Sequence, residues 1–134
     1  MKQYFFFTMI ALGLVFSACK KDDEPDIKAG KLAGSNWVKE FKDKSSITEN
    51  DYTVTIKFTS DKEGAYVRVG SWKVYSYSTK KWTSGRYNDN DKFTYVYSTE
   101  LKQGVWTYSN KKQVIFSFSD DYQTLKAGSN YSRK

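Results

Sequence analysis

Residues 52–59 alternate strictly between apolar or aromatic positions and polar ones, and this pattern constrains the fold more than any other feature of the chain. The apolar or aromatic positions are Tyr52, Val54, Ile56 and Phe58, with Thr or Lys between them. Successive side chains of a β-strand point to opposite faces of a sheet. The segment therefore predicts a strand with one buried face and one solvated face.

Similar segments rich in Val, Thr, Tyr, Phe and Trp recur throughout the rest of the chain, and none of them shows a helical period. They cover residues 36–42, 65–69, 72–78, 92–98, 104–109, 113–119 and 122–127, with residues 81–87 forming either a strand or a long loop. Turn-like segments at residues 60–64, 88–91, 109–112 and 119–121 separate them. The pattern predicts about eight short antiparallel strands that pair in sequence order.

A sheet of this size avoids exposed edges by closing into a barrel or by stacking as two layers. The short, even spacing favours an all-β fold with a single antiparallel meander barrel over residues 31–134, and a β-sandwich is the alternative. Four aromatic residues are expected in its core: Trp37, Phe58, Phe116 and Phe118.

The N-terminal segment predicts export from the cytoplasm. Lys2 precedes an uncharged run over residues 4–16, which ends at the small residues Ser17 and Ala18. A membrane-spanning helix needs about 20 apolar residues, so this run is too short to span a bilayer. A charged start, a short apolar run and small residues before a cleavage site predict a signal peptide over residues 1–18.

The chain's one cysteine, Cys19, directly follows these small residues. The sequence from Phe16 to Cys19 resembles a bacterial lipoprotein signal, although Phe16 stands where Leu, Val or Ile is usual. The resemblance implies that Cys19 is acylated and becomes the first residue of the mature protein. Its acyl chains would then be the protein's contact with a membrane.

The charged block after Cys19 consists of Lys20, Lys21, Asp22, Asp23 and Glu24. It resembles the lipoprotein export signal of Bacteroidetes, which implies display at the outer face of the outer membrane. A solvated spacer is the alternative reading, since a charged run that contains proline is disordered by composition. Residues 19–30 are predicted to be a flexible, lipidated tether.

Two segments resemble the small lipocalin-like domains of Bacteroidetes lipoproteins. Residues 32–41, LAGSNWVKEF, are similar to their first strand, and residues 104–118 are similar to their late hairpin. The spacing from Gly34 to Trp37 is one residue longer than the Gly-x-Trp of lipocalins. The resemblance implies a barrel of about eight strands with a cup for an apolar ligand.

The chain is basic, with a formal net charge of +7. Residues 31–134 contain eighteen Lys and Arg against eleven Asp and Glu, and most of the lysines are scattered. Solvated faces of amphipathic strands explain this scatter, while an anionic partner such as an acidic glycan is the alternative. An extracellular location argues against nucleic acid as a partner.

The residue types required for most catalytic sites are missing from the sequence. The chain has no histidine, which excludes Ser-His-Asp and Cys-His arrangements and the usual zinc ligand sets. The adjacent acids Asp120 and Asp121, and likewise Asp89 and Asp91, fall in predicted turns rather than across a cleft. We expect neither a catalytic residue, nor a metal site, nor a cofactor, and hence a protein that is not an enzyme.

Nineteen aromatic residues follow residue 18, and eight of them occur where the strands are less apolar. These candidate ligand-binding residues are Tyr75, Tyr77, Trp82, Tyr87, Tyr95, Tyr97, Trp106 and Tyr108. On paired strands they would form a continuous stripe that stacks against a sugar or a protein, or they would only stabilise the sheet as cross-strand pairs.

The sequence therefore predicts a surface-anchored, non-catalytic lipoprotein. It would bind a small apolar molecule or a glycan through a barrel cavity or an aromatic face. The alternative is an accessory subunit or adhesin of an outer-membrane protein assembly.

Overall fold

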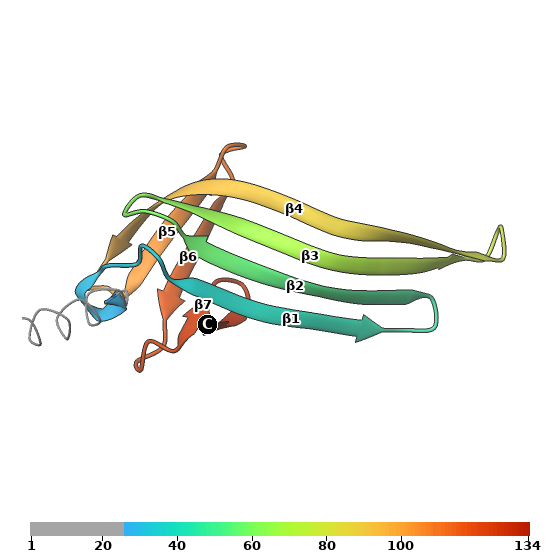
Figure 1. Ribbon diagram of the computed structural model, residues 1–134, viewed down its shortest axis with the longest axis horizontal. Helices are drawn as coiled ribbons and strands as arrows, with labels where there is room; N and C mark the ends of the chain where they lie inside the picture. The colour runs from blue at the N-terminus through green and yellow to red at the C-terminus, as the bar shows by residue number, and fades with distance from the viewer. Residues whose placement is uncertain (1–25) are drawn as a thin grey trace, which may run out of the picture.

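The computed structural model describes residues 26–134. The predicted signal peptide, Cys19 and the charged block at residues 20–24 lie outside the described residues. Within these residues eight antiparallel strands pair in sequence order, and the last pairs with the first, so that the sheet closes into a barrel (Figure 1). The predicted all-β meander barrel is confirmed, and the sandwich alternative was wrong.

The strands differ greatly in length. They are β1 (Asn36–Lys44), β2 (Thr48–Phe58), β3 (Glu63–Ser76), β4 (Lys81–Ser98), β5 (Gln103–Tyr108), β6 (Gln113–Phe118), β7 (Thr124–Lys126) and β8 (Asn130–Arg133). A short 3-10 helix, η1 (Ile27–Ala29), precedes them. The first four strands are long and the last four are short.

The long strands extend beyond the barrel as a twisted four-stranded sheet, here called the arm (residues 39–53 and 67–92; Figure 1). In the described chain, β5 pairs with β4 along residues 93–98, and β8 pairs with β1 at Trp37 and Val38. The outer parts of β1 and β4 therefore form the two edges of the arm.

The length of β3 and β4 corrects the sequence-based prediction. Residues 65–69 and 72–78 belong largely to one strand, and residues 88–91 lie inside β4 rather than in a turn. Asn and Asp favour turns when only local sequence is considered. In β4, however, Asp89 lies opposite Arg68 of β3, and this cross-strand pair holds the segment extended.

Aromatic side chains fill the interior of the barrel. The predicted core residues are all confirmed: Trp37 is 0% exposed, Phe58 and Phe116 are 1%, and Phe118 is 5%. Phe58 has its ring centroid 4.9 Å from that of Tyr95 and 5.5 Å from that of Phe116. A Cβ atom at Gly104 would collide with the Phe116 ring, which shows how closely the rings approach the barrel wall.

The barrel has one closed end, here called the base. Ile27 of η1 and Leu32 are buried and belong to the same core cluster. The predicted tether over residues 19–30 therefore extends too far, because the apolar Ile27 side chain packs into the barrel. The arm leaves from the opposite end (Figure 1).

The face that lines the interior of the barrel continues along the arm. The residues opposite one another in the strand pairing share a face, so Tyr52, Arg68 and Tyr87 follow the same alternation as the core residues Val54 and Phe93. We call this side of the arm its inner face, and the opposite side its outer face.

Candidate functional site

The eight candidate aromatic residues do not form one stripe, because the strands that carry them run from the barrel out along the arm. Tyr95 and Trp106 lie in the core, and Tyr97 and Tyr108 pack against it. Tyr87 lies on the inner face of the arm, while Tyr75, Tyr77 and Trp82 lie at its far end.

The two core residues act as structural groups. Trp106 is 2% exposed, and its ring stacks on that of Phe93 with 4.9 Å between centroids. The Tyr95 hydroxyl donates a hydrogen bond to the Ser60 carbonyl oxygen at 2.7 Å. Burial raises the pKa of Tyr95 to about 12, so this phenol stays protonated at neutral pH.

The open end of the barrel, beside the arm, contains a half-enclosed pocket of about 430 Å³, here called the mouth. Strands β3, β4, β5, β6 and β8, with the turns beside them, contribute its lining. The lining residues are Tyr66, Arg68, Asp89, Asp91, Trp106, Tyr108, Ser109, Asn110, Lys112, Val114, Ala127 and Tyr131.

An ion pair forms one wall of the mouth. The Arg68 Nε donates to an Asp89 carboxylate oxygen at 2.6 Å, and the Arg68 guanidinium lies 4.2 Å from the centroid of the Tyr87 ring. Partial burial acts to lower the pKa of Arg68, but the hydrogen bond and charge of Asp89 outweigh it and raise that pKa. The wall therefore presents a fixed positive and a fixed negative group side by side.

Three tyrosines supply neutral hydroxyl groups to the same pocket. Burial raises the pKa of Tyr66 and Tyr108, and it raises the pKa of Tyr131 to about 12. Phenols in this state donate and accept hydrogen bonds.

Trp106 also contributes to the lining of the mouth. Among the described residues, Trp106 Nε1 is buried without a partner in hydrogen-bonding geometry. Its N–H nevertheless partly offsets the effect of burial on Tyr108, because it lowers the pKa of that phenol. This indole nitrogen is enclosed by protein and belongs with the structural groups of the core.

Aromatic rings continue from the mouth along the inner face of the arm. The Tyr87 and Tyr52 rings meet edge to face at 4.9 Å, and the Tyr52 and Phe41 rings stack at 4.8 Å. The Tyr87 hydroxyl donates to the side-chain oxygen of Asn50 at 3.1 Å. Arg68, which lines the mouth and lies over the Tyr87 ring, connects the mouth to this row of rings.

Of the residues that line the mouth, sequence reasoning identified Trp106 and Tyr108 but missed most of the polar ones. Asp89 and Asp91 were not among the ligand-binding candidates because residues 88–91 were assigned to a turn, and Arg68 was not among them because only aromatic residues were selected. The signal was present in the alternation of Tyr87, Asp89, Asp91 and Phe93, which places these side chains on one face of a strand.

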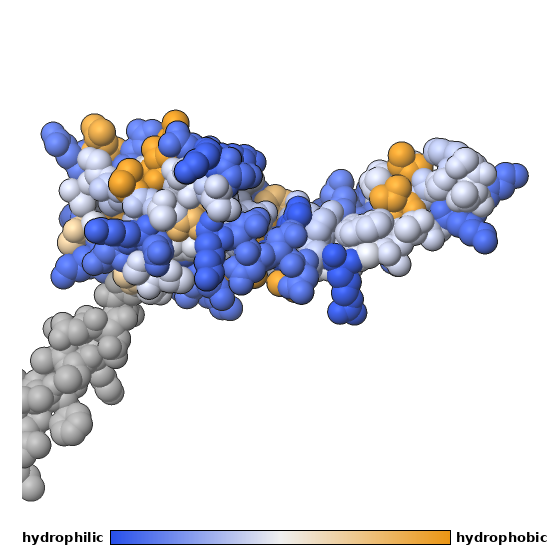
Figure 2. Space-filling model, turned by 90° about the horizontal axis from the view of Figure 1, so that it is seen from above, coloured by the Kyte–Doolittle hydropathy of each residue, from blue (hydrophilic) through white to orange (hydrophobic). Residues whose placement is uncertain are grey.

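The far end of the arm carries a second aromatic group. The Tyr75 ring lies 5.4 Å from that of Tyr77 and 5.5 Å from that of Trp82. Figure 2 shows hydrophobic atoms at this end, separated from those of the barrel by a largely hydrophilic stretch of the arm. Tyr75 and Trp82 lie on the outer face of the arm, whereas Tyr87 lies on the inner face, so the two aromatic groups are distinct.

The described residues contain neither a cluster of His, Cys, Asp or Glu able to hold a metal ion nor a helix long and apolar enough to cross a bilayer. Comparisons with protein-family models, curated proteins and solved structures give no match to this chain. Its function must therefore be argued from the surfaces themselves.

Proposed function

We propose that this protein is a non-catalytic lipoprotein on the outer surface of an outer membrane, and that it binds a glycan in the mouth and along the inner face of the arm. The observation that carries the proposal is the composition of the mouth. Aromatic rings, a fixed ion pair and neutral phenols converge on one half-enclosed pocket above a filled barrel.

A sugar ring fits this combination because it has apolar C–H faces and a rim of hydroxyl groups. Tyrosine and tryptophan rings provide stacking surfaces with polar ends. Arg68, Asp89 and Asp91 provide charged hydrogen-bonding groups, which form the stronger hydrogen bonds. The volume of about 430 Å³ lies in the range of small-molecule sites, roughly 300–1,000 Å³.

The filled interior gives less support to the other predicted ligand, a small apolar molecule inside the barrel. The core rings of Phe58, Trp106 and Phe116 occupy the centre, where lipocalin-like proteins would hold such a ligand. A polar ligand at the rim requires no rearrangement of these rings.

The position of η1 supports the anchored orientation. Ile27 enters the core at the base, and the mouth lies at the opposite end of the barrel. A chain held to a membrane through acyl groups on Cys19 would thus be attached through its base. The mouth and the arm would then face away from the point of attachment.

Replacing acidic or aromatic residues of the mouth should weaken glycan binding. After an array of bacterial and host oligosaccharides has identified a ligand, titration calorimetry should show a loss of about tenfold or more for Asp91→Ala and Tyr66→Ala. The matched controls Asp120→Ala and Tyr77→Ala change exposed residues outside the mouth and should bind as the unchanged protein does. Binding of no oligosaccharide, or equal losses in the controls, would refute the proposal and favour the accessory-subunit alternative.

Anchoring is tested separately in a diderm bacterial host. Cys19→Ala should release the protein from the membrane fraction, because acyl chains supply the attachment. Replacing Asp22, Asp23 and Glu24 by Ala should leave it anchored but protect it from protease added to whole cells. A protein that remains in the membrane fraction after Cys19→Ala would contradict the lipoprotein assignment.

A further inference from the structure

We propose that the far end of the arm is a contact site for an anionic lipid bilayer. We define the tip as Ile47, Val74, Tyr75, Tyr77, Lys80, Lys81 and Trp82. This inference does not depend on glycan binding, because the tip shares no residue with the mouth.

The tip exposes large apolar and aromatic side chains to solvent. Tyr77 is 72% exposed, Trp82 is 47% and Val74 is 43%. Trp and Tyr concentrate at membrane–water interfaces, where the ring enters the apolar region and the polar atom stays hydrated. The tip therefore carries the residue types that a bilayer interface selects.

The exposed side chains of the tip lie on both faces of the arm and do not form a patch on one side. Tyr75 pairs with Trp82 on the outer face, whereas Val74 pairs with Thr83 on the inner face. Ile47 of the neighbouring hairpin lies beside them, since its carbonyl oxygen accepts from the Tyr75 amide at 2.8 Å. A folded protein partner would cover one face, whereas a bilayer surrounds an inserted tip on all sides.

The positive charge of the β3–β4 hairpin favours a bilayer that contains anionic lipids. Residues 72–87 contain Lys73, Lys80, Lys81 and Arg86 and no acidic residue. Basic residues close to a bilayer are attracted by anionic lipids over about a Debye length. Lys80 and Lys81 stand between Tyr77 and Trp82 in the sequence, so the attraction acts where the rings would insert.

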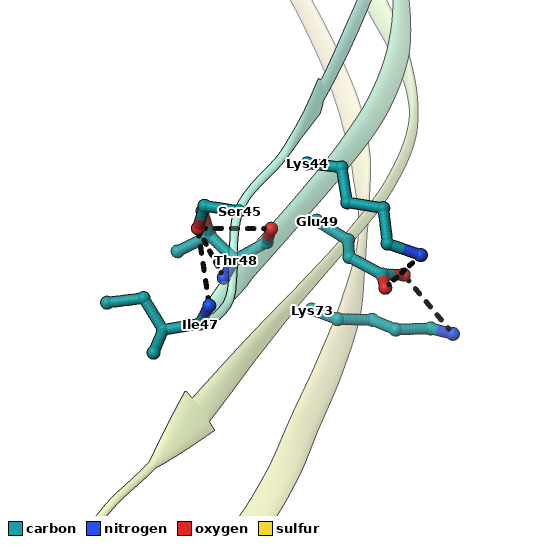
Figure 3. A network of polar contacts seen from close by, with 6 residues as sticks. All are labelled: Lys44, Ser45, Ile47, Thr48, Glu49 and Lys73. Atoms are coloured by element: carbon teal, nitrogen blue, oxygen red, sulfur yellow. Dashed lines mark hydrogen bonds and ion pairs between the residues drawn. The ribbon is translucent and has the colours of Figure 1, made fainter.

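The nearest acidic side chain in the adjoining β2 is already neutralised by lysines (Figure 3). Glu49 lies 3.0 Å from Lys44 and 3.9 Å from Lys73, measured between charged atoms. The hydrogen bond from Lys44 is the main reason that the pKa of Glu49 is lowered, so Glu49 remains ionised within this pair. Its charge therefore offsets lysines farther back on the arm, not the two lysines at the turn.

The shape of the arm makes insertion geometrically feasible. Residues 81–92 of β4 extend past the strand's pairing with β5, a reach of roughly 35–40 Å at about 3.3 Å per residue. The bulk of the barrel is therefore well separated from the tip. The tip can meet a bilayer without a collision between barrel and lipid.

The test places a fluorescent probe at the tip of the full chain. Cys19→Ser removes the native thiol, and Thr79→Cys introduces a labelling site in the exposed turn. A matched control has the label at Ser109→Cys, in the β5–β6 turn beside the mouth. Vesicles of phosphatidylcholine alone, or with 30% phosphatidylglycerol, carry nitroxide-labelled lipids that quench a probe inserted among them.

The expected result is quenching at position 79 that is at least threefold stronger than at position 109 and requires phosphatidylglycerol. Tyr77→Ser with Trp82→Ser, and separately Lys80→Gln with Lys81→Gln, should each reduce the quenching at position 79 at least threefold without changing the thermal unfolding midpoint. These comparisons hold even if the N-terminal segment itself binds the vesicles, since the probe reports only on its own surroundings.

Equal quenching at positions 79 and 109, or quenching at position 79 that is unaffected by the four substitutions, would overturn the inference. Quenching that is the same with and without phosphatidylglycerol would overturn the requirement for an anionic surface. Failure of the glycan experiment would leave this result unaffected, because the substituted tip residues lie outside the mouth and the two tests use separate ligands.

Discussion

Phe58→Ala should lower the free energy of unfolding by about 3–5 kcal/mol, the usual range for removing a buried phenylalanine ring. Phe58 is 1% exposed, and its ring meets those of Phe93, Tyr95, Trp106 and Phe116 at centroid distances of 4.9–6.5 Å. Its removal leaves a cavity among rigid rings that cannot collapse into the space. Urea unfolding followed by tryptophan fluorescence measures the effect.

Phe41→Ala is the matched control, since it removes the same atoms from the arm. Phe41 is half-buried on the inner face and stacks against Tyr52. Here we expect a loss of about 1 kcal/mol, because an aromatic pair contributes about 0.5–1.5 kcal/mol beyond its burial and little other surface is lost. Equal losses at the two positions would show that the arm contributes as much to global stability as the core does.

Raising the pH from 10 to 12 should destabilise the protein through its buried phenols. Burial raises the pKa of Tyr95 and Tyr131 to about 12, above the ordinary value of 10.0. Below pH 10 both phenols are protonated in the folded and unfolded states, and their contribution to stability is fully present. As the pH rises towards 12, the unfolded state ionises first, so the contribution is lost.

A shift of one pKa unit corresponds to about 1.4 kcal/mol, and solvent near the two hydroxyl groups lowers the effect, so we expect a loss of roughly 2 kcal/mol for each phenol. Urea titrations at several pH values measure this loss of unfolding free energy.

Tyr131→Phe removes an ionisable group from the mouth and should flatten the dependence of unfolding free energy on pH. A stability that does not change between pH 10 and pH 12 would contradict the burial of these groups.

The sequence contained enough information to predict the fold class but too little to predict the arm. Alternation over residues 52–59 depends only on neighbours in the chain, and it correctly identified the buried face of β2. The extent of β3 and β4 depends on pairing between strands, such as Arg68 with Asp89, which local turn propensity cannot reveal. The short strand β8 was missed because residues 130–133 contain only one apolar or aromatic side chain, Tyr131.

The candidate site was predictable in its residue type but not in its location. Aromatic residues were correctly singled out as the chain's most abundant recognition groups, yet Tyr87 and Tyr75 lie on opposite faces of the arm. Whether an aromatic side chain lies in the core, in the mouth or at the tip depends on where its strand leaves the barrel. That position is set by the lengths of β5 and β8, the partners of the outer strands.

The closure of the barrel also affects how the chain folds. Seven of the eight strand pairs in the described chain join strands that follow each other in sequence, and hairpins of this kind form within about 1–10 μs. The remaining pair, β1 with β8, rests on Trp37 opposite Arg133 and Val38 opposite Ser132. Among the strand pairs of the described chain, this one joins the segments farthest apart in sequence, so it has the largest loop-closure entropy, and only two residues of each strand are paired. We therefore expect the pairing of β1 with β8 to be the slowest step of folding, and the arm, whose strands pair only with their neighbours in sequence, to form without it.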